Sequence, residues 1–442
     1  MKKTQPEVFP WRSMVLALFS AGLILVNPLN ALASDSDRIA ELERKLEQSL
    51  KQMEVFSAKI KQLEAANSDS TKGSGSTREA DTQQKAKLEE IEQRVAQLGA
   101  AANRPPIIDG IPLHGFADVG AGWSGKGNPK GFSVGSLALY LTPRFTDNVK
   151  GLVELIFEYN EAGELATDLE RVQLGYTYSD AATVWMGRFH TPYGYWNTGF
   201  HHGERIQTSL KRPRLIDFED KGGILPAHSV GAWLTGKVKA GEGKVSYDLY
   251  LANAPRIGGE VVGAGTLNMN NAGSTNHSAS LGFNAAYNFT GNLEGLRLGL
   301  HGLKADVRDE TPAANATRLQ MLGGYAFYDN NDWEVLAEYY HFNNKDTSTS
   351  TGTFKSWAGF AQVGHSFAKW TPYARLEKAI LDQNDLYFSQ QASGRSYGRE
   401  ALGVRYDLNQ YAALKFELTH TRQTDVDYQN YSEARMQYAI RF

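Results

Sequence analysis

The chain of 442 residues contains no cysteine. It can therefore form no disulfide bond, no thiolate metal site and no covalent link to a c-type haem. Charge of one sign is not in excess either, because 46 Lys and Arg stand against 49 Asp and Glu, a formal net charge of −3. This balance indicates no nucleic-acid partner.

Long hydrophobic runs are missing as well. The longest apolar run covers 14–26, about 13 residues where a helix needs roughly 20 to span a bilayer. Only helices and closed barrels satisfy every backbone hydrogen bond in hydrocarbon. Any membrane insertion of the remaining chain therefore has to use a β-barrel, whose alternating apolar residues also agree with the negative mean hydropathy.

The first 33 residues have the three parts of a secretory signal peptide. Bases, an apolar run and a small-x-small cleavage pattern follow one another, at Lys2, Lys3 and Arg12, at 14–26, and at Ala31 to Ala33. We expect the mature chain to begin near Ser34 and to be exported.

Residues 34–66 read as heptads of an α-helical coiled coil. The core positions are Ile39, Leu42, Leu46, Ser49, Met53, Phe56, Ile60 and Leu63. A flexible linker is expected over 67–85, and a short helix with a second linker over 86–111. The apolar seam of the coil must be buried, so we expect this helix to associate with copies of itself. A coil of three helices would fit the barrel described below. A single helix lying along the barrel base or the cell wall is the alternative.

From 112 onward the pattern alternates between apolar and polar residues, as in Leu281, Phe283, Ala285 and Tyr287. This predicts an all-β transmembrane barrel of about 16 antiparallel strands over 112–442, a size that encloses an aqueous channel. Strands are expected to start near 112, 132, 149, 168, 182, 227, 243, 276, 294, 317, 331, 353, 368, 396, 410 and 431. Fourteen or eighteen strands, or a soluble β-sandwich, are the alternatives.

The chain ends on an alternating segment with Tyr438, Ile440 and Phe442 on its apolar face. This segment resembles the terminal signal by which Gram-negative outer-membrane barrels are handed to the barrel assembly machinery. With the long interruption at 191–226, which follows the fifth expected strand, the exported chain resembles a trimeric outer-membrane porin, of the subgroup with an N-terminal periplasmic coiled coil. The resemblance implies a homotrimer in outer-membrane lipid and a third outward loop that folds into the lumen.

The loop at 191–226 carries aromatic residues at its start, followed by mixed bases and acids. If it folds inward, we expect it to form the pore constriction with Tyr193, Tyr195, Trp196, Glu204, Arg205, Lys211, Arg212, Arg214, Asp217 and Glu219. Rings beside ionic groups suit the passage of small organic solutes. A solvated external loop is the alternative.

The period-two pattern also predicts which polar side chains line the pore wall. They are Asp118, Arg144, Glu154, Glu158, Arg171, Arg188, Asp248, Arg297, Arg375, Glu377, Arg405, Lys415, Glu417, Arg435 and Arg441. Bases slightly outnumber acids, which gives a weak lean toward anions. The predicted function is a porin for passive diffusion of small hydrophilic or organic solutes.

Catalysis is not expected. His201 and His202 lack the spaced partners of a metal site, and no Ser/His/acid set has a recognisable context. We therefore predict no enzyme, no metal and no cofactor. The rival functions are a barrel sheath around a separate cytochrome and a structural link from the outer membrane to the cell wall through the coil.

Overall fold

The computed structural model describes residues 113–125, 130–159, 163–200, 205–258, 265–269, 273, 278–309, 316–348, 352–423 and 430–442. The predicted signal peptide (1–33), coiled coil (34–66), linker (67–85) and short helix (86–111) lie outside the described residues. Within the described part of the chain, no helix is long and apolar enough to cross a membrane.

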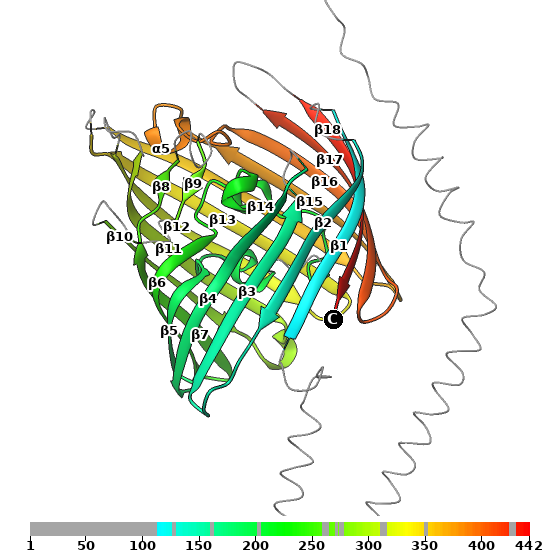
Figure 1. The fold of residues 1–442 in the computed structure, drawn as a ribbon, viewed down its shortest axis with the longest axis horizontal. Coiled ribbons are helices and arrows are strands. Elements are labelled where there is room, and N and C mark those ends of the chain that lie inside the picture. Colours follow the sequence, from blue (N-terminus) through cyan, green and yellow to red (C-terminus); the bar gives the residue numbers. More distant parts are fainter. Residues whose placement is uncertain are drawn as a thin grey trace, which may run out of the picture. The chain divides into compact units, whose positions relative to one another are not determined.

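Sixteen long strands form one antiparallel wall (Figure 1). The first eight run along the chain from a strand close to the predicted start at 112. They are β1 (Leu113–Ser124), β2 (Gly131–Leu141), β3 (Val149–Tyr159), β4 (Leu165–Ser179), β5 (Ala182–His190), β6 (His228–Ala240), β7 (Gly243–Asn253) and β10 (Ala279–Asn288). The other eight are β11 (Leu296–Asp309), β12 (Ala316–Asp329), β13 (Trp333–Asp346), β14 (Thr353–His365), β15 (Trp370–Ile380), β16 (Tyr397–Asp407), β17 (Ala412–Gln423) and β18 (Tyr431–Arg441).

The wall closes because β1 pairs with β18, from Phe116 opposite Arg441 to Ser124 opposite Glu433. Each long strand otherwise pairs with its neighbours in chain order, and β7 pairs directly with β10. The prediction of sixteen strands is therefore confirmed, with starts displaced by a few residues.

The short elements lie in the connections between wall strands. They are α4 (Trp196–Gly199), η2 (Arg214–Ile216), η3 (Glu219–Lys221), β8 (Arg256–Ile257), β9 (Leu267–Asn268), η4 (Gly291–Leu293) and α5 (Leu386–Ser389). The two-residue strands β8 and β9 pair with each other, and β8 runs parallel to the end of β11. The sequence pattern did not predict this hairpin or α5.

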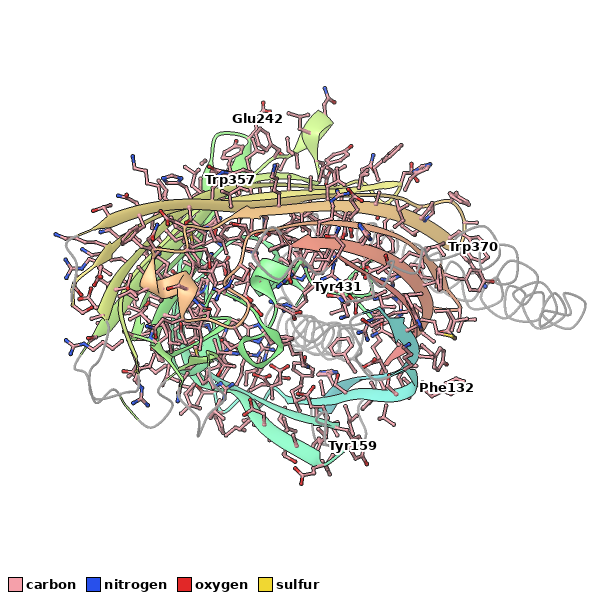
Figure 2. The ribbon with its side chains drawn as sticks, turned by 90° about the horizontal axis from the view of Figure 1, so that it is seen from above. Phe132, Tyr159, Glu242, Trp357, Trp370 and Tyr431 are labelled. Atoms are coloured by element: carbon pink, nitrogen blue, oxygen red, sulfur yellow. The ribbon has the colours of Figure 1, made fainter. Side chains whose placement is uncertain are left out.

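Side chains alternate across the wall as the period of two requires. Leu300 and Leu402 are about three-fifths exposed on the outside, whereas their neighbours His301 and Ala401 are buried. Seen from above, Phe132, Tyr159, Trp357 and Trp370 lie at the periphery of the barrel (Figure 2).

The lumen is not uniformly polar. One apolar cluster joins inward residues of β11–β14, such as Leu319 and Phe342, to Ile224 of the loop, Leu267 of β9 and Phe388 of α5. A second, much smaller cluster lies on β2 and β3. The apolar cluster fills one side of the interior, so most buried charges gather on the side formed by β15–β18 and β1–β4.

Candidate functional site

The loop between β5 and β6 contacts inward residues of strands far away in the sequence. Its aromatic start is held by Glu338 of β13, whose Oε1 accepts hydrogen bonds from the backbone N–H groups of Tyr195 (2.9 Å) and Trp196 (2.7 Å). Gly194 precedes them with a φ of 61°, and a Cβ atom at this position would overlap the Glu338 carboxylate. The start of the loop therefore lies inside the barrel against β13.

Tyr193 and Trp196 are fully buried in the apolar cluster. Trp196 packs edge-on against Phe360 of β14 at a centroid distance of 5.8 Å. Burial raises the pKa of the Tyr193 hydroxyl well above its usual value, so this group is neutral. These two rings, predicted to form the constriction, fix the position of the loop instead of facing water. Tyr195 stacks on Phe327 at 3.9 Å.

The middle of the loop rests on bases that were predicted to line the pore wall. Lys415 Nζ donates to the carbonyl groups of Gln207 (2.7 Å) and Ser209 (3.1 Å). Arg405 donates to the same Gln207 carbonyl group at 3.0 Å. Both bases are buried. They bind the backbone of the loop and are not exposed to water in the lumen.

Arg375 has the same role on β15. It is fully buried, pairs with Glu377 at 2.9 Å, and donates to the Lys211 carbonyl group at 2.8 Å. Glu377 in turn accepts from the backbone N–H of Arg214 at 2.8 Å. Three successive stretches of the loop are thus bonded to the inner face of β13–β17.

The last part of the loop returns toward β3, β4 and β6. Glu219 contacts Nδ1 of His228 at 3.2 Å, and Glu170 of β4 contacts the other ring nitrogen at 2.8 Å. Burial acts to raise the pKa of Glu219, but the adjacent His228 outweighs this effect and lowers it. Lys221 pairs with Glu158 of β3 at 2.6 Å. The loop therefore crosses the interior and contacts both sides of the barrel.

The loop bases divide into two groups. Arg205 is buried and pairs with Asp407 at 2.8 Å, and Arg212 is buried and donates to Asn197 at 2.7 Å. Lys211 and Arg214 are half-buried. Arg214 stacks over the ring of Tyr397 at 4.8 Å.

Lys211 belongs to a cluster in which bases outnumber acids. Glu433 of β18 is the carboxylate that all three bases share, and it contacts Lys211 (3.8 Å), Arg399 (3.1 Å) and Arg435 (3.0 Å). The side chains of Lys211 and Arg435 are about one-third exposed, while those of Arg399 and Glu433 are buried. Burial lowers the pKa of Lys211, against the opposing effect of Glu433. We call Lys211, Arg399, Arg435 and Glu433 the basic cluster.

Other predicted wall residues form ion pairs with acids of β3 and β4 or bond to neutral groups. Arg171 pairs with Glu154 across β3 and β4, and Arg188 pairs with Asp168 and Glu170 at 3.1 Å each. Asp118 accepts from the Ser136 backbone at 2.9 Å and from Gln437 at 3.0 Å.

Arg144 is exposed in the turn between β2 and β3, so it lies at the rim of the barrel and not on its inner wall. The preceding residue, Pro143, has no N–H group and so cannot continue the hydrogen-bond ladder of β2.

Asp217 of the loop is half-buried. Glu204 and the pair His201 and His202 lie outside the described residues. Among the residues that the structure does describe, no group of three or more His, Asp or Glu is arranged to hold a metal ion.

Glu338, Arg399 and Glu433 were not among the predicted site residues. All three follow the same alternation that selected Arg435, so the signal was present in the sequence.

The terminal residues Tyr438 and Phe442 are about half exposed on the outer face. The Phe442 backbone exchanges two hydrogen bonds with Gly115, at 2.9 and 3.0 Å, so it completes the seam between the last strand and the first.

Comparisons with known proteins agree with this architecture. No family model matches the chain, and no curated protein matches its sequence. Among solved structures, the anion-selective porin from Comamonas acidovorans superposes with a TM-score of 0.51 at 13% identity, covering 75% of this chain and 99% of that one. OmpF of Salmonella typhi in complex with daunomycin also gives 0.51, at 14% identity, covering 75% and 97%. The chain therefore has the closed sixteen-strand fold of Gram-negative outer-membrane porins.

Proposed function

We propose that this protein is an outer-membrane porin, a water-filled channel for passive diffusion of small hydrophilic solutes with a preference for anions. The observation that carries the proposal is the basic cluster. Three bases share the carboxylate of Glu433 at the place where the inserted loop meets β16 and β18. Charges in the narrow part of a pore govern which ions enter.

The position of the inserted loop favours a narrowed channel over an unobstructed tube. It is bonded to β13–β17 through Glu338, Arg375 and Lys415, and to β3 through Lys221. Solutes would then pass between the loop and the side formed by β1–β4 and β18. Lys211 and Arg214 would face this passage, with Tyr193 and Trp196 holding the loop from behind.

A sheath around a separate cytochrome is less well supported. The loop, α5 and the β8–β9 hairpin all contribute buried apolar residues to the interior. They occupy space that a partner chain would need. A link to the cell wall through residues 34–66 is compatible with transport and is a separate proposal.

The homotrimer is also a proposal, supported by the outer surface of β1–β5. Its outward residues stay apolar along the strands, with large exposed side chains such as Phe132, Leu174 and Met186. Apolar exposed patches of this kind suit contact with another subunit. The predicted coiled coil at 34–66 would hold the three copies together in the periplasm.

The reversal potential of the channel in a salt gradient tests the proposed function. In the variant Lys211→Gln with Arg435→Gln we expect the anion-over-cation permeability ratio to fall by roughly two- to fivefold, about 0.5–1 kcal/mol for partly exposed charges. The matched control is Lys239→Gln with Lys244→Gln, which removes two exposed bases beside the turn between β6 and β7. An unchanged ratio in the first variant would show that the basic cluster does not set the field of the pore.

A further inference from the structure

Three aromatic side chains stand at the border between the apolar cluster and the open part of the lumen. Tyr195 of the loop, Trp233 of β6 and Phe327 of β12 are only partly buried, and they pack against the buried members of the cluster. Tyr195 and Phe327 stack at a centroid distance of 3.9 Å, and Trp233 stacks on Trp185 of β5 at 6.3 Å. We call Tyr195, Trp233 and Phe327 the aromatic edge.

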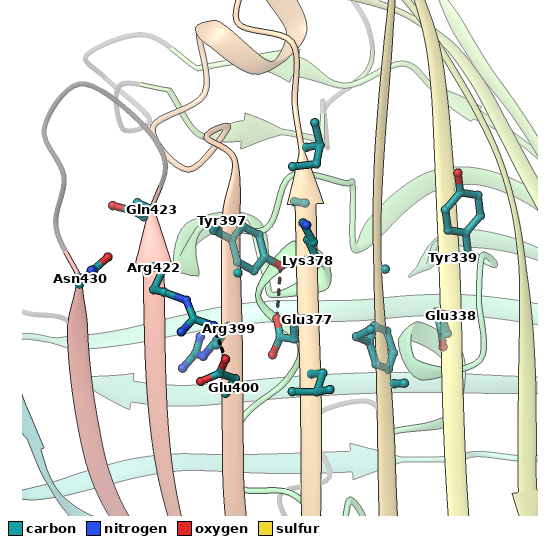
Figure 3. Close-up of a pocket in the computed structure, with 17 residues that line it drawn as sticks. Glu338, Tyr339, Glu377, Lys378, Tyr397, Arg399, Glu400, Arg422, Gln423 and Asn430 are labelled. Carbon is teal, nitrogen blue, oxygen red and sulfur yellow. Dashed lines mark hydrogen bonds and ion pairs between the residues drawn. The ribbon is translucent and has the colours of Figure 1, made fainter.

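The aromatic edge lies on the turn side of the inserted loop. Phe327 is two residues from the end of β12, where the N–H of Asp329 donates to the carbonyl group of Gly295 at 3.2 Å, in the turn before β11. Tyr195 is kept at this level because Glu338 of β13, labelled in Figure 3, accepts its backbone N–H at 2.9 Å. A solute that has passed the loop therefore meets these rings next.

One acid and one base accompany the rings. Asp248 of β7 accepts a hydrogen bond from the indole Nε1 of Trp233 at 3.0 Å. The Arg297 guanidinium of β11 lies 5.5 Å from the centre of the Tyr195 ring, and its Nε donates to Asn288 at 2.6 Å. Both charged side chains are half-buried, and both are oriented by neutral groups.

Asp248 and Arg297 have no counterion of their own. They act on each other electrostatically, with a smaller contribution to Asp248 from the exposed Lys237. Among the residues that the structure describes, however, neither Asp248 nor Arg297 forms an ion pair. Elsewhere in the lumen buried bases have direct carboxylate partners, as Arg375 has in Glu377 at 2.9 Å. One negative and one positive charge thus remain for a ligand.

We propose that the aromatic edge, with Asp248 and Arg297, binds small aromatic solutes that carry both an ammonium and a carboxylate group, as aromatic amino acids do. The ammonium group would bind Asp248 and the carboxylate Arg297, both through charge-assisted hydrogen bonds, while the ring packs on the aromatic edge. Ligand sites commonly combine apolar rings with a few polar groups that fix orientation.

This binding site goes beyond the proposed anion preference, which depends on the basic cluster. It rests on the proposed function in one respect only, namely that the lumen is open to water. The ligand-observed NMR titration described next measures binding to the full-length protein in detergent micelles and needs no ion flow. Binding and conduction can therefore fail separately.

The first test compares four solutes on the unmodified protein, with the signal of protein-free micelles subtracted. L-phenylalanine should bind most tightly. 3-Phenylpropionate lacks the ammonium group and 2-phenylethylamine lacks the carboxylate, so each should bind roughly tenfold more weakly, the effect of one lost hydrogen bond to a charged group. L-alanine, which has no ring, should also bind at least roughly tenfold more weakly.

The second test exchanges the charges of the protein. Asp248→Asn should weaken the binding of L-phenylalanine and 2-phenylethylamine roughly tenfold and should not weaken that of 3-phenylpropionate. Arg297→Gln should weaken L-phenylalanine and 3-phenylpropionate and spare the amine. Phe327→Leu should weaken all three aromatic solutes. The matched control is Asp306→Asn with Arg318→Gln, which neutralises an exposed ion pair and should change none of them.

Equal binding of the three aromatic solutes to the unmodified protein would overturn the proposal. So would a loss of the amine and the acid to the same extent in either charge variant. Single-channel conductance without solute shows that each variant is folded. A channel that conducts but does not bind L-phenylalanine would overturn this inference alone, whereas a protein that binds it but does not conduct would overturn the porin proposal alone.

Discussion

A single buried carboxylate, Glu338, holds the start of the inserted loop. It accepts two loop N–H groups, those of Tyr195 and Trp196, and also the hydroxyl group of Tyr340. Glu338 Oε1 is the acceptor for both loop N–H groups, and an unpaired buried donor is costly. The position of the aromatic segment therefore depends on an oxygen acceptor at residue 338.

We expect Glu338→Leu to loosen residues 193–200 by about 1–3 kcal/mol, the cost of leaving buried donors unpaired. Hydrogen exchange of the loop amides should quicken and single-channel recordings should become noisier. Glu338→Gln keeps one acceptor oxygen and should recover most of the protection. Equal exchange in the Leu variant and the unmodified protein would mean that packing alone holds this segment.

A second residue-scale effect concerns pH. Asp385 is fully buried at the start of α5, where it accepts from the backbone N–H of Tyr387 and from Asn344. Burial raises the pKa of Asp385 to about 6. Since the folded pKa lies above the ordinary value, the ionised carboxylate destabilises the loop at 381–396 above about pH 6. This destabilisation is relieved as the pH falls toward 4.

The loop at 381–396 should therefore be more firmly held at pH 5 than at pH 7.5, by about 1.4 kcal/mol, roughly half of the full effect of the raised pKa. Limited proteolysis with a protease active at both values, or hydrogen exchange corrected for intrinsic rates, would measure the difference. Asp385→Asn should remove the pH dependence. A loop that becomes looser on acidification would contradict the assignment.

At the scale of elements, the terminal strand is completed by its last residue. The ring of Phe442 lies over Gly115 of β1, where any Cβ atom would overlap it. Gly115→Val should therefore impair membrane insertion nearly as much as Phe442→Asp, which places a charge on the lipid face. Gly125→Ala is the control, because its nearest neighbours are in ordinary contact at 3.5 Å. Normal membrane levels of the Gly115→Val variant would show that assembly does not depend on the contact between the Phe442 ring and Gly115.

The elements also show what the sequence could and could not predict. The sixteen strands were predictable because an apolar outer face and a polar inner face alternate along each strand, as in β10 and β17. Whether an inward base meets water or a loop carbonyl group was not predictable, since it depends on the path of the loop. Arg375 and Lys415 follow the same period as Arg435, yet they lie beneath the loop.

The apolar filling of the lumen was missed for a related reason. Ile257, Leu267 and Phe388 stand in connections rich in Gly, Asn and Ser, where two or three apolar residues are too few to show a period. They are buried only because the connections fold back onto β11–β14. Local sequence carries no signal for such long-range contacts.

For the whole molecule, the apolar outer surface of β1–β5 predicts contact with other copies of the chain. Leu174 and Met186 pair on neighbouring strands of the apolar side and are about three-fifths exposed. Changing both to Gln should convert trimers to monomers in cross-linking or native mass spectrometry, because the change adds polar groups to a buried subunit interface.

The matched control for the subunit interface is Leu300→Gln with Leu322→Gln. These residues are about as exposed as Leu174 and Met186, but they lie on β11 and β12, outside the proposed subunit interface. They should leave the trimer intact. If both double variants gave monomers, the substitutions would destabilise the barrel in general. If both remained trimers, the subunit interface would lie on another part of the outer surface.

The central claim is that the loop at 191–226 borders the conducting path at Lys211, and the absence of cysteine allows a direct test. In Lys211→Cys, methanethiosulfonate reagents should lower the single-channel conductance, and a sulfonate-bearing reagent should also shift the reversal potential toward cations. Lys239→Cys, at the turn rim, should respond little. Mass spectrometry would first verify that the cysteine of the Lys211→Cys variant is labelled. If the conductance and the reversal potential of the labelled channel are then unchanged, the account is contradicted.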